Sequence, residues 1–170
     1  MIPNILSIAG SDPSGGAGIQ ADIKAISACG GYAMAAITAL TVQNTCGVRG
    51  VQMVDPGFVA DQIQALRDDI RIDAVKIGML GTSDIIEAVA AVLHGLDAPI
   101  VLDPVMVAKG GDRLLQAEAV EALRQFLPHA TVITPNLPEA ADLLRQPEAS
   151  SREMMEAQAR ELLALAACRT

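Results

Sequence analysis

Aromatic residues are nearly missing from this sequence, which has no tryptophan, one tyrosine and two phenylalanines in 170 residues. Basic residues are also few, because 12 lysines and arginines stand against 20 acidic residues and leave a net charge of −8. Proteins that bind nucleic acids usually combine a basic surface with aromatic side chains on which bases stack. We therefore expect no nucleic-acid partner.

Long apolar runs, zinc-binding patterns and disulfide patterns are missing as well. Polar or charged residues interrupt every apolar stretch well before the length of a membrane span, and no basic segment precedes the first short apolar run. The cysteines Cys29, Cys46 and Cys168 form no CxxC pair, and His94 and His129 lie far apart. We expect no membrane association, no zinc site and a reducing, cytoplasmic setting.

Apolar residues are abundant instead. They make up 51% of the chain, and about 59% when its 14 glycines are counted, against a usual share of about 45–50%. The sequence has no linker and no repeat, so we expect a single domain over residues 1–170. The apolar surplus suggests that a partner subunit or a further chain covers part of its surface.

Apolar runs of strand length alternate with segments of helical periodicity. Strands are predicted at Asn4–Ala9, within Ala33–Val42, and at Val51–Val54, Ala74–Ile77, Ile100–Leu102 and Thr131–Ile133. Helices are predicted at Ala17–Cys29, from Asp55 and Pro56 onward, and at Ser83–Leu93, Ala117–Phe126 and Leu137–Leu144. A last helix runs to about Ala167 from Ser150-x-x-Glu153, which has the pattern of a capping box.

This alternation is typical of an α/β fold with a mainly parallel sheet and helices on both faces. In such folds ligands bind beyond the carboxyl ends of the strands. The polar and glycine-rich segments of this sequence fall at those ends.

The first of these segments is the loop at residues 10–18, GSDPSGGAG, whose backbone N–H groups could bind an anion or a polar ligand. It is not a P-loop, because Gly16 and Ala17 stand where Lys and Ser/Thr are required. Gly16-x-Gly18-x-x-Ala21 matches a dinucleotide fingerprint, but the loop is too long and the next strand ends without an acid. A tight turn that needs glycine is the structural alternative.

Three further residues have both a binding and a structural interpretation. Gln43, in TVQNT, carries an amide that can pair with an aminopyrimidine edge or with its own backbone. Met79, between Gly78 and Gly81, is either an apolar lid over a ligand or a core residue of an ordinary turn. Asp22, on the first helix, is otherwise an exposed carboxylate.

Asp103 and Glu139 follow two later strands, in the segments DPVM and TPNLPE. Mg²⁺ usually binds one or two carboxylates together with phosphate, so this pair could share an ion. Helix capping is the alternative, with Asn136 as the N-cap and Glu139 as its partner. No base–nucleophile pair accompanies them, so the inventory suits phosphoryl transfer, which depends mainly on positioning and charge neutralisation.

Taken together, five segments resemble the hydroxymethylpyrimidine/phosphomethylpyrimidine kinases of the ribokinase-like superfamily. They are AGSDPSGGAGIQADIKAISACGGY, ITALTVQNTCGV, VKIGMLGT, VLDPVMVAKGGDRLL and VITPNLPEA, which cover nearly the whole chain in the family's order. The resemblance implies a three-layer αβα sandwich, of which this chain holds the N-terminal part. It also implies ATP-dependent phosphorylation of 4-amino-5-hydroxymethyl-2-methylpyrimidine, then of its monophosphate, for thiamine diphosphate synthesis.

The same resemblance implies the site residues. Asp22 and Gln43 would hydrogen-bond the aminopyrimidine, in a pocket lined by Ala9, Gly10, Asp22, Gln43, Met79 and Val105. The nucleotide and magnesium region would comprise Asn136 and Glu139 for ATP, and Asp103 and Glu139 for Mg²⁺. Members of the family are typically cytoplasmic homodimers.

One family segment, Gly-Thr-Gly-Cys at a helix N-terminus, does not occur in these 170 residues. In the family it forms the anion hole for the transferring phosphoryl group. The 170 residues alone are therefore expected to be nearly inactive as a kinase, yet able to bind the pyrimidine weakly. Two alternatives stay open: a pyridoxal-type kinase of the same superfamily, against which the QNT segment argues, and a non-catalytic pyrimidine-binding fragment.

Overall fold

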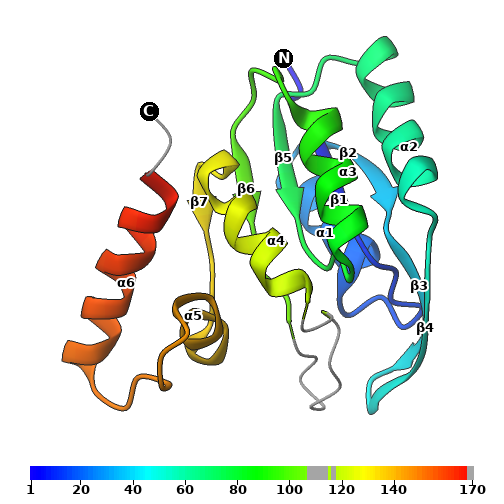
Figure 1. Cartoon of the computed structure of the whole chain (residues 1–170). Coiled ribbons are helices and arrows are strands. Elements are labelled where there is room, and N and C mark those ends of the chain that lie inside the picture. The colour runs from blue at the N-terminus through cyan, green and yellow to red at the C-terminus, as the bar shows by residue number, and fades with distance from the viewer. Residues whose placement is uncertain (107–114, 116–117, 168–170) are drawn as a thin grey trace.

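A computed structural model gives the fold and describes residues 1–106, 115 and 118–167. The elements follow one another as β1 (Asn4–Ala9), α1 (Gly18–Ala28), β2 (Tyr32–Ile37), β3 (Ala39–Asn44), β4 (Gly47–Met53), α2 (Pro56–Asp69), β5 (Ala74–Ile77), α3 (Ser83–Leu93), β6 (Ile100–Leu102), α4 (Ala119–Phe126), a 3₁₀ turn (Leu127–His129), β7 (Val132–Ile133), α5 (Leu137–Leu144) and α6 (Arg152–Ala167). Figure 1 traces this order from the blue N-terminus to the red α6.

The main sheet has five strands in the order β2-β1-β5-β6-β7, and every neighbouring pair is parallel. Parallel neighbours need a crossover connection, and α1, α3 and α4 supply three of these. Because the strands are parallel, their carboxyl ends lie at one edge of the sheet. This edge carries β1, β5, β6 and β7 side by side.

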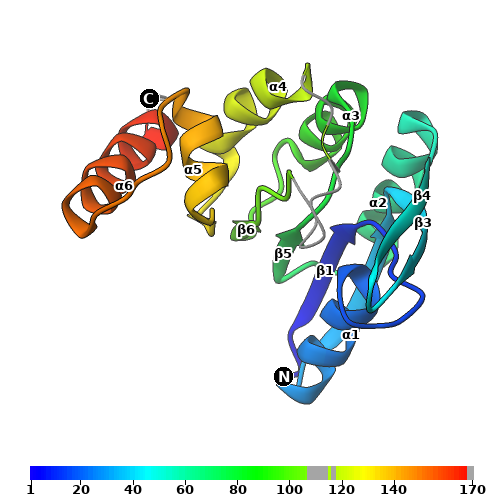
Figure 2. The same ribbon diagram turned by 90° about the horizontal axis from the view of Figure 1, so that it is seen from below.

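Helices cover both faces of the sheet, as the sequence predicts. Figure 2 shows α1 on one side and α2, α3 and α4 on the other. Alternate strand residues, among them Leu6, Ile8 and Ile77, pack into the main apolar core with Val59 of α2 and Val89 of α3. The mainly parallel α/β fold is thus confirmed.

The predicted single strand within Ala33–Val42 is wrong, because the chain forms two strands there. Thr38 separates them: it is fully buried, and its hydroxyl donates to the carbonyl of Met79 at 2.6 Å. The next strand, β3, leaves the main sheet and pairs antiparallel with β4 across a two-residue turn. The short strand predicted at Val51–Val54 corresponds to the second half of β4, which ends at Met53.

Local signals explain most helix boundaries. Asp55 caps α2 by accepting from the N–H of Phe58 at 3.1 Å, and Thr82 caps α3 in the same way. The capping box predicted for the last helix at Ser150 and Glu153 is wrong, because the N–H of Met154 donates to the hydroxyl oxygen of Ser151 and α6 begins at Arg152. The predicted start of α4 at residue 117, and residues 107–114 of the segment VLDPVMVAKGGDRLL, lie outside the described residues. No helix in the described ranges is long and apolar enough to span a membrane.

Candidate active site

The glycine-rich loop between β1 and α1 is organised around Asp12, which the sequence analysis did not single out. Its carboxylate accepts from the N–H groups of Ser14, Gly16 and Ala17 at 2.8–3.0 Å and from the hydroxyl of Ser14 at 2.7 Å. Its own N–H donates to Gln20 at 2.8 Å. An Asp two residues before a Ser in a glycine-rich turn is the pattern of an Asx-turn, which could have revealed this role.

These bonds decide the charge state of Asp12. Burial by itself would raise the pKa of the carboxyl group, but the bonds from Ser14, Ala17 and Gly16 together lower it below the ordinary value. Hydrogen bonds to the ionised form have this effect. The N–H groups that the sequence analysis offered to an external anion at Gly16 and Ala17 are therefore used by the loop's own carboxylate.

The end of β1 packs closely against the start of α1 and against Met79. Gly18 has φ +54°, and a Cβ there would lie 2.2 Å from the carbonyl oxygen of Gly10. A Cβ on Gly10 would in turn meet the sulfur of Met79 at 3.2 Å and Ala39 at 3.7 Å. Ala9, Gly10 and Met79, three residues predicted to line the pyrimidine pocket, are thus brought together.

Asp22 joins this group through two residues that sequence reasoning missed. Ser7 of β1 donates its hydroxyl proton to the Oδ2 of Asp22 at 2.6 Å, and Lys76 of β5 contacts the same oxygen at 3.0 Å. A Cβ on Gly78 would lie 3.0 Å from the Lys76 Nζ and 3.2 Å from the Cβ of Ala9. Asp22 is therefore paired rather than simply solvent-exposed, and its pairing partner adjoins Gly78 and Ala9.

The sequence did contain a signal for the two partners of Asp22, because each is a polar residue inside an apolar strand. Ser7 interrupts NILSIA and Lys76 interrupts AVKI, and the two are direct neighbours in the parallel register. Residues at matched positions of adjacent strands point to the same face of the sheet. Here that face is the one covered by α1.

Gln43 and Val105 are not joined to this group by any contact found among the described residues. Gln43 is half-buried on β3, where the ribbon register shifts between Val42 and Gln43. The base of the ribbon is fixed to the glycine-rich loop, since Thr41 donates its hydroxyl proton to the carbonyl of Ser11 at 2.9 Å. Val105, half-buried, follows β6.

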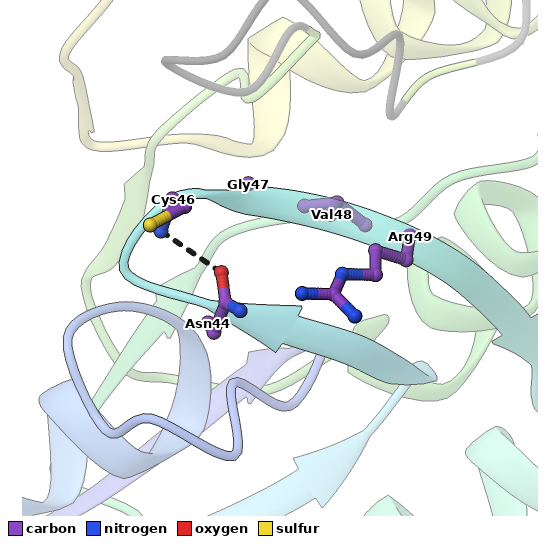
Figure 3. Close-up of a pocket in the computed structure, with 5 residues that line it drawn as sticks. All are labelled: Asn44, Cys46, Gly47, Val48 and Arg49. Carbon is purple, nitrogen blue, oxygen red and sulfur yellow. Dashed lines mark hydrogen bonds between the residues drawn. The ribbon is translucent and has the colours of Figure 1, made fainter.

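The β3–β4 ribbon also carries an open hollow of about 270 Å³ near its turn. It is lined by Asn44, Cys46, Gly47, Val48 and Arg49, and Figure 3 shows the Arg49 side chain reaching across toward β3. The side chain of Asn44 accepts from the N–H of Cys46 at 2.9 Å. None of the residues predicted to line the pyrimidine pocket lines this hollow.

Asp103 and Glu139 follow the ends of β6 and β7, and the charge of Asp103 acts on Glu139. Asn136 and Glu139 form the predicted capping box of α5, with both of its hydrogen bonds at 2.9 Å. Burial raises the pKa of Glu139, and the negative charge of Asp103 raises it further, against the hydrogen bonds from Asn136 and Met106. The carboxylate that caps α5 is therefore also subject to the negative charge of Asp103.

This acidic pair fits a magnesium ion only in part. No group of three or more His, Cys, Asp or Glu side chains in the described ranges could hold a metal by itself. Mg²⁺ is commonly bound by one or two carboxylates together with water and substrate phosphate. Two carboxylates that repel one another match that ligand set, with phosphate supplying the rest.

Residues 12–170 match the sequence profile of the family described as phosphomethylpyrimidine kinase. The chain belongs to this family. It is 55% identical over 164 residues to a hydroxymethylpyrimidine/phosphomethylpyrimidine kinase of Salmonella typhimurium, covering 95% of this chain and 62% of that protein. The family resemblance inferred from the five sequence segments is confirmed.

Solved structures agree with the fold. A phosphomethylpyrimidine kinase from Clostridium difficile superimposes with a TM-score of 0.88 at 43% identity, over 96% of this chain and 71% of that one. A Bacillus subtilis pyridoxal kinase, solved as an ADP complex, gives 0.87 at 41% identity, over 98% of this chain and 64% of that one. The chain spans about three fifths of the length of the Salmonella relative.

Proposed function

We propose that this chain is the pyrimidine-binding and magnesium-binding part of a kinase domain. The whole enzyme phosphorylates 4-amino-5-hydroxymethyl-2-methylpyrimidine and then its monophosphate with ATP, in thiamine diphosphate synthesis. The proposal rests on one observation in a chain of this family. The acidic residues Asp103 and Glu139 lie at the same edge of the sheet as Ala9, Gly10 and Met79, which pack together at the end of β1. An open parallel sheet binds its ligands at that edge.

The pyrimidine half uses backbone and side-chain groups of β1, α1, β3 and β5. Gly10 lacks a side chain, which lets the sulfur of Met79 pack against the backbone at the end of β1 and places both residues beside the proposed pocket. Asp22 accepts from the ring's amino group, and Gln43 can both donate and accept. These two residues orient the hydroxymethyl group toward the ends of β6 and β7.

The phosphate half uses Asp103, Asn136 and Glu139. The two carboxylates would hold Mg²⁺, which neutralises the charge of the transferring phosphoryl group. The Oδ1 of Asn136 accepts from the N–H of Glu139, which leaves the amide Nδ2 to donate to a phosphate oxygen. Asp103 also accepts a weak bond from Thr134 at 3.4 Å, so one of its oxygens has a neighbour that limits its rotation.

The enzyme we propose is a cytoplasmic homodimer with this chain within one α/β domain. The cysteine pattern supports a reducing compartment. The apolar share of the sequence supports a subunit interface, and Leu40 and Val42 of the ribbon are 52% and 64% exposed.

Pyridoxal phosphorylation is the second candidate, because the similarity to the Bacillus subtilis pyridoxal kinase is almost as high in TM-score as that to the pyrimidine kinase. Both alcohols are hydroxymethyl heteroaromatics. Calorimetric titration of the chain with each one separates the two candidates. We expect measurable binding of the aminopyrimidine and weaker binding of pyridoxal, and the reverse order would favour the second candidate.

Gln43→Ala should weaken aminopyrimidine binding by about 1–3 kcal/mol, because hydrogen bonds in a closed pocket are lost. Asn44→Ala is the matched control, since Asn44 is the next residue on the ribbon and is exposed. Equal affinities for wild type and Gln43→Ala would remove Gln43 from the pocket. An ATP-coupled assay on the 170 residues and on a version extended along the family domain then tests whether turnover needs the additional residues.

A further inference from the structure

The Ser7–Asp22–Lys76 cluster has an arrangement that a simple link between α1 and the sheet would not need. Both donors converge on a single oxygen, Oδ2, at 2.6 and 3.0 Å. Within the ranges that the structure describes, no donor is found on Oδ1 of Asp22. The side chains of Asp22 and Lys76 are 17% and 28% exposed, so the cluster is neither sealed in the core nor freely solvated.

The cluster also lies near the carboxyl ends of β1 and β5. Lys76 approaches Gly78, where an added Cβ would lie 3.0 Å from its Nζ and 3.2 Å from Ala9. Gly78 therefore lies next to both the ammonium group of Lys76 and Ala9 at the end of β1. Residues 78 and 9 lie at the carboxyl ends of their strands, the edge at which ligands bind in such sheets.

We propose that Lys76 and Ser7 are positioning residues that fix Asp22 and present its Oδ1 to the amino group of the pyrimidine. This inference rests on the proposed function and adds the basis of its specificity. The Oδ2 of Asp22 already contacts an ammonium group and a hydroxyl, so the oxygen that Asp22 offers to a ligand is Oδ1, as a hydrogen-bond acceptor. Its open oxygen then selects a ring substituent that donates.

Selection follows from the chemistry of the substituent at C4 of the ring. An amino group donates to a carboxylate, whereas a carbonyl oxygen at the same place brings two acceptors together. A site built to hydrogen-bond one group discriminates strongly against an analogue that leaves a buried polar partner unpaired. The cluster would therefore separate the 4-amino alcohol from its 4-oxo counterpart, 5-hydroxymethyl-2-methylpyrimidin-4-one.

The experiment measures dissociation constants for these two compounds by calorimetry on the 170-residue chain. Lys76→Met should weaken binding of the amino compound by about tenfold while leaving the oxo compound unchanged or tighter, so the selectivity ratio falls. Ser7→Ala should lower the ratio less, because the ammonium contact remains. Lys76→Arg, which keeps the charge, should restore most of the selectivity.

Two controls separate positioning from a general structural role. Arg71→Met removes another ion pair, Arg71–Asp73 at 2.8 Å, beside the amino end of β1, and should leave the ratio unchanged. In an Asp22→Asn background, Lys76→Met should have little further effect on the ratio, because the group it positions is gone. If circular dichroism shows that Lys76→Met is unfolded, Ser7→Ala and Lys76→Arg carry the comparison.

The outcomes distinguish the two proposals. If the wild-type chain binds the amino compound, and Lys76→Met and Ser7→Ala have the same selectivity ratio as wild type, the positioning role is overturned. The proposed function then still stands. A wild-type chain that binds neither compound overturns the proposed pyrimidine site, and the positioning role with it. We expect a lower selectivity ratio in Lys76→Met and recovery of most of the ratio in Lys76→Arg. In the Asp22→Asn background, Lys76→Met should no longer lower the ratio.

Discussion

Two carboxylates at the same edge of the sheet have opposite surroundings. Asp12 accepts four hydrogen bonds from its own loop, and these lower its pKa although it is buried. Glu139 is also buried, but the charge of Asp103 adds to burial and its pKa is raised. The glycine-rich loop is thus electrostatically satisfied, whereas the β6–β7 end holds negative charge that the described residues do not neutralise.

This difference fits our proposal that the loop is scaffold and that the β6–β7 end binds a cation. A carboxylate whose bonds are all supplied locally rigidifies its loop and has little left for a ligand. A pair of carboxylates that repel each other is stabilised when a cation binds between them. A glycine-rich loop attracts attention in a sequence, but here its amides at Gly16 and Ala17 are already used by Asp12, whereas the less conspicuous acids Asp103 and Glu139 repel one another.

The largest effect should come from filling the closest contact of the loop. Gly18→Ala should destabilise the chain by about 3 kcal/mol or more, because its Cβ would lie 2.2 Å from the Gly10 carbonyl oxygen and φ is positive. Urea denaturation followed by circular dichroism measures this change.

Gly30→Ala is the matched control. Gly30 also has a positive φ, of 83°, but nothing lies within 4 Å of an added Cβ. Only the backbone cost of about 1–2 kcal/mol is expected there. Equal losses for the two variants would mean that the contact between Gly18 and Gly10 contributes nothing to stability.

The same chemical change in the two carboxylate regions should have different results. Asp12→Asn should cost about 1.5–3 kcal/mol at neutral pH, since hydrogen bonds to a charged group are lost. Asp103→Asn should be near neutral, within about 0.5 kcal/mol, because it also relieves the repulsion on Glu139. Denaturant midpoints of both variants test the contrast directly.

The cost of Asp12→Asn should also depend on pH. Because the folded-state pKa of Asp12 is lowered, its stabilisation is present above the ordinary value of 3.8 and is lost as pH falls below it. The two unfolding curves should therefore approach one another in acid. A difference that stays constant down to low pH would show that the charge of Asp12 is not what organises the loop.

The smallest expected effect concerns Glu139→Gln in metal-free buffer. A raised pKa means that the folded chain holds this proton more tightly than the unfolded chain, so the contribution of Glu139 to stability falls as pH rises above 4.5. Gln does not titrate, so the melting temperature of the variant should rise relative to wild type over that range. In an Asp103→Asn background this trend should weaken, and an unaltered trend would exclude Asp103 as one of its causes.

The strands and helices of the main sheet were largely predictable, because each carries a local signal. Ala74–Ile77, Ser83–Leu93, Ile100–Leu102 and Leu137–Leu144 are confirmed residue for residue. The apolar stretch from residue 33 to 42 misled the prediction, since apolarity does not reveal which sheet a strand joins. The division at Thr38 depends on its bond to Met79, 41 residues away.

The site was predictable in part for the same reason. The capping box of Asn136 and Glu139 is local, and the resemblance to the family supplied Asp22 and Met79. Ser7 and Lys76 were missed because their contacts with Asp22 depend on adjacent register positions of two strands and on the helix that covers them. The action of the Asp103 charge on Glu139 likewise depends on the order of the strands, which periodicity does not give.

The strand order also sets the sequence of events by which the chain reaches its native state. The β3–β4 ribbon needs only a two-residue turn, and such hairpins form within about 1–10 μs. Strand β1, in contrast, gains its neighbour β5 only after a long loop closes, as the bond from Asn4 to Asp73 spans 69 residues. Pairings of high sequence separation slow folding, so β1 should remain exposed on its β5 side until residues near Ile77 have been synthesised.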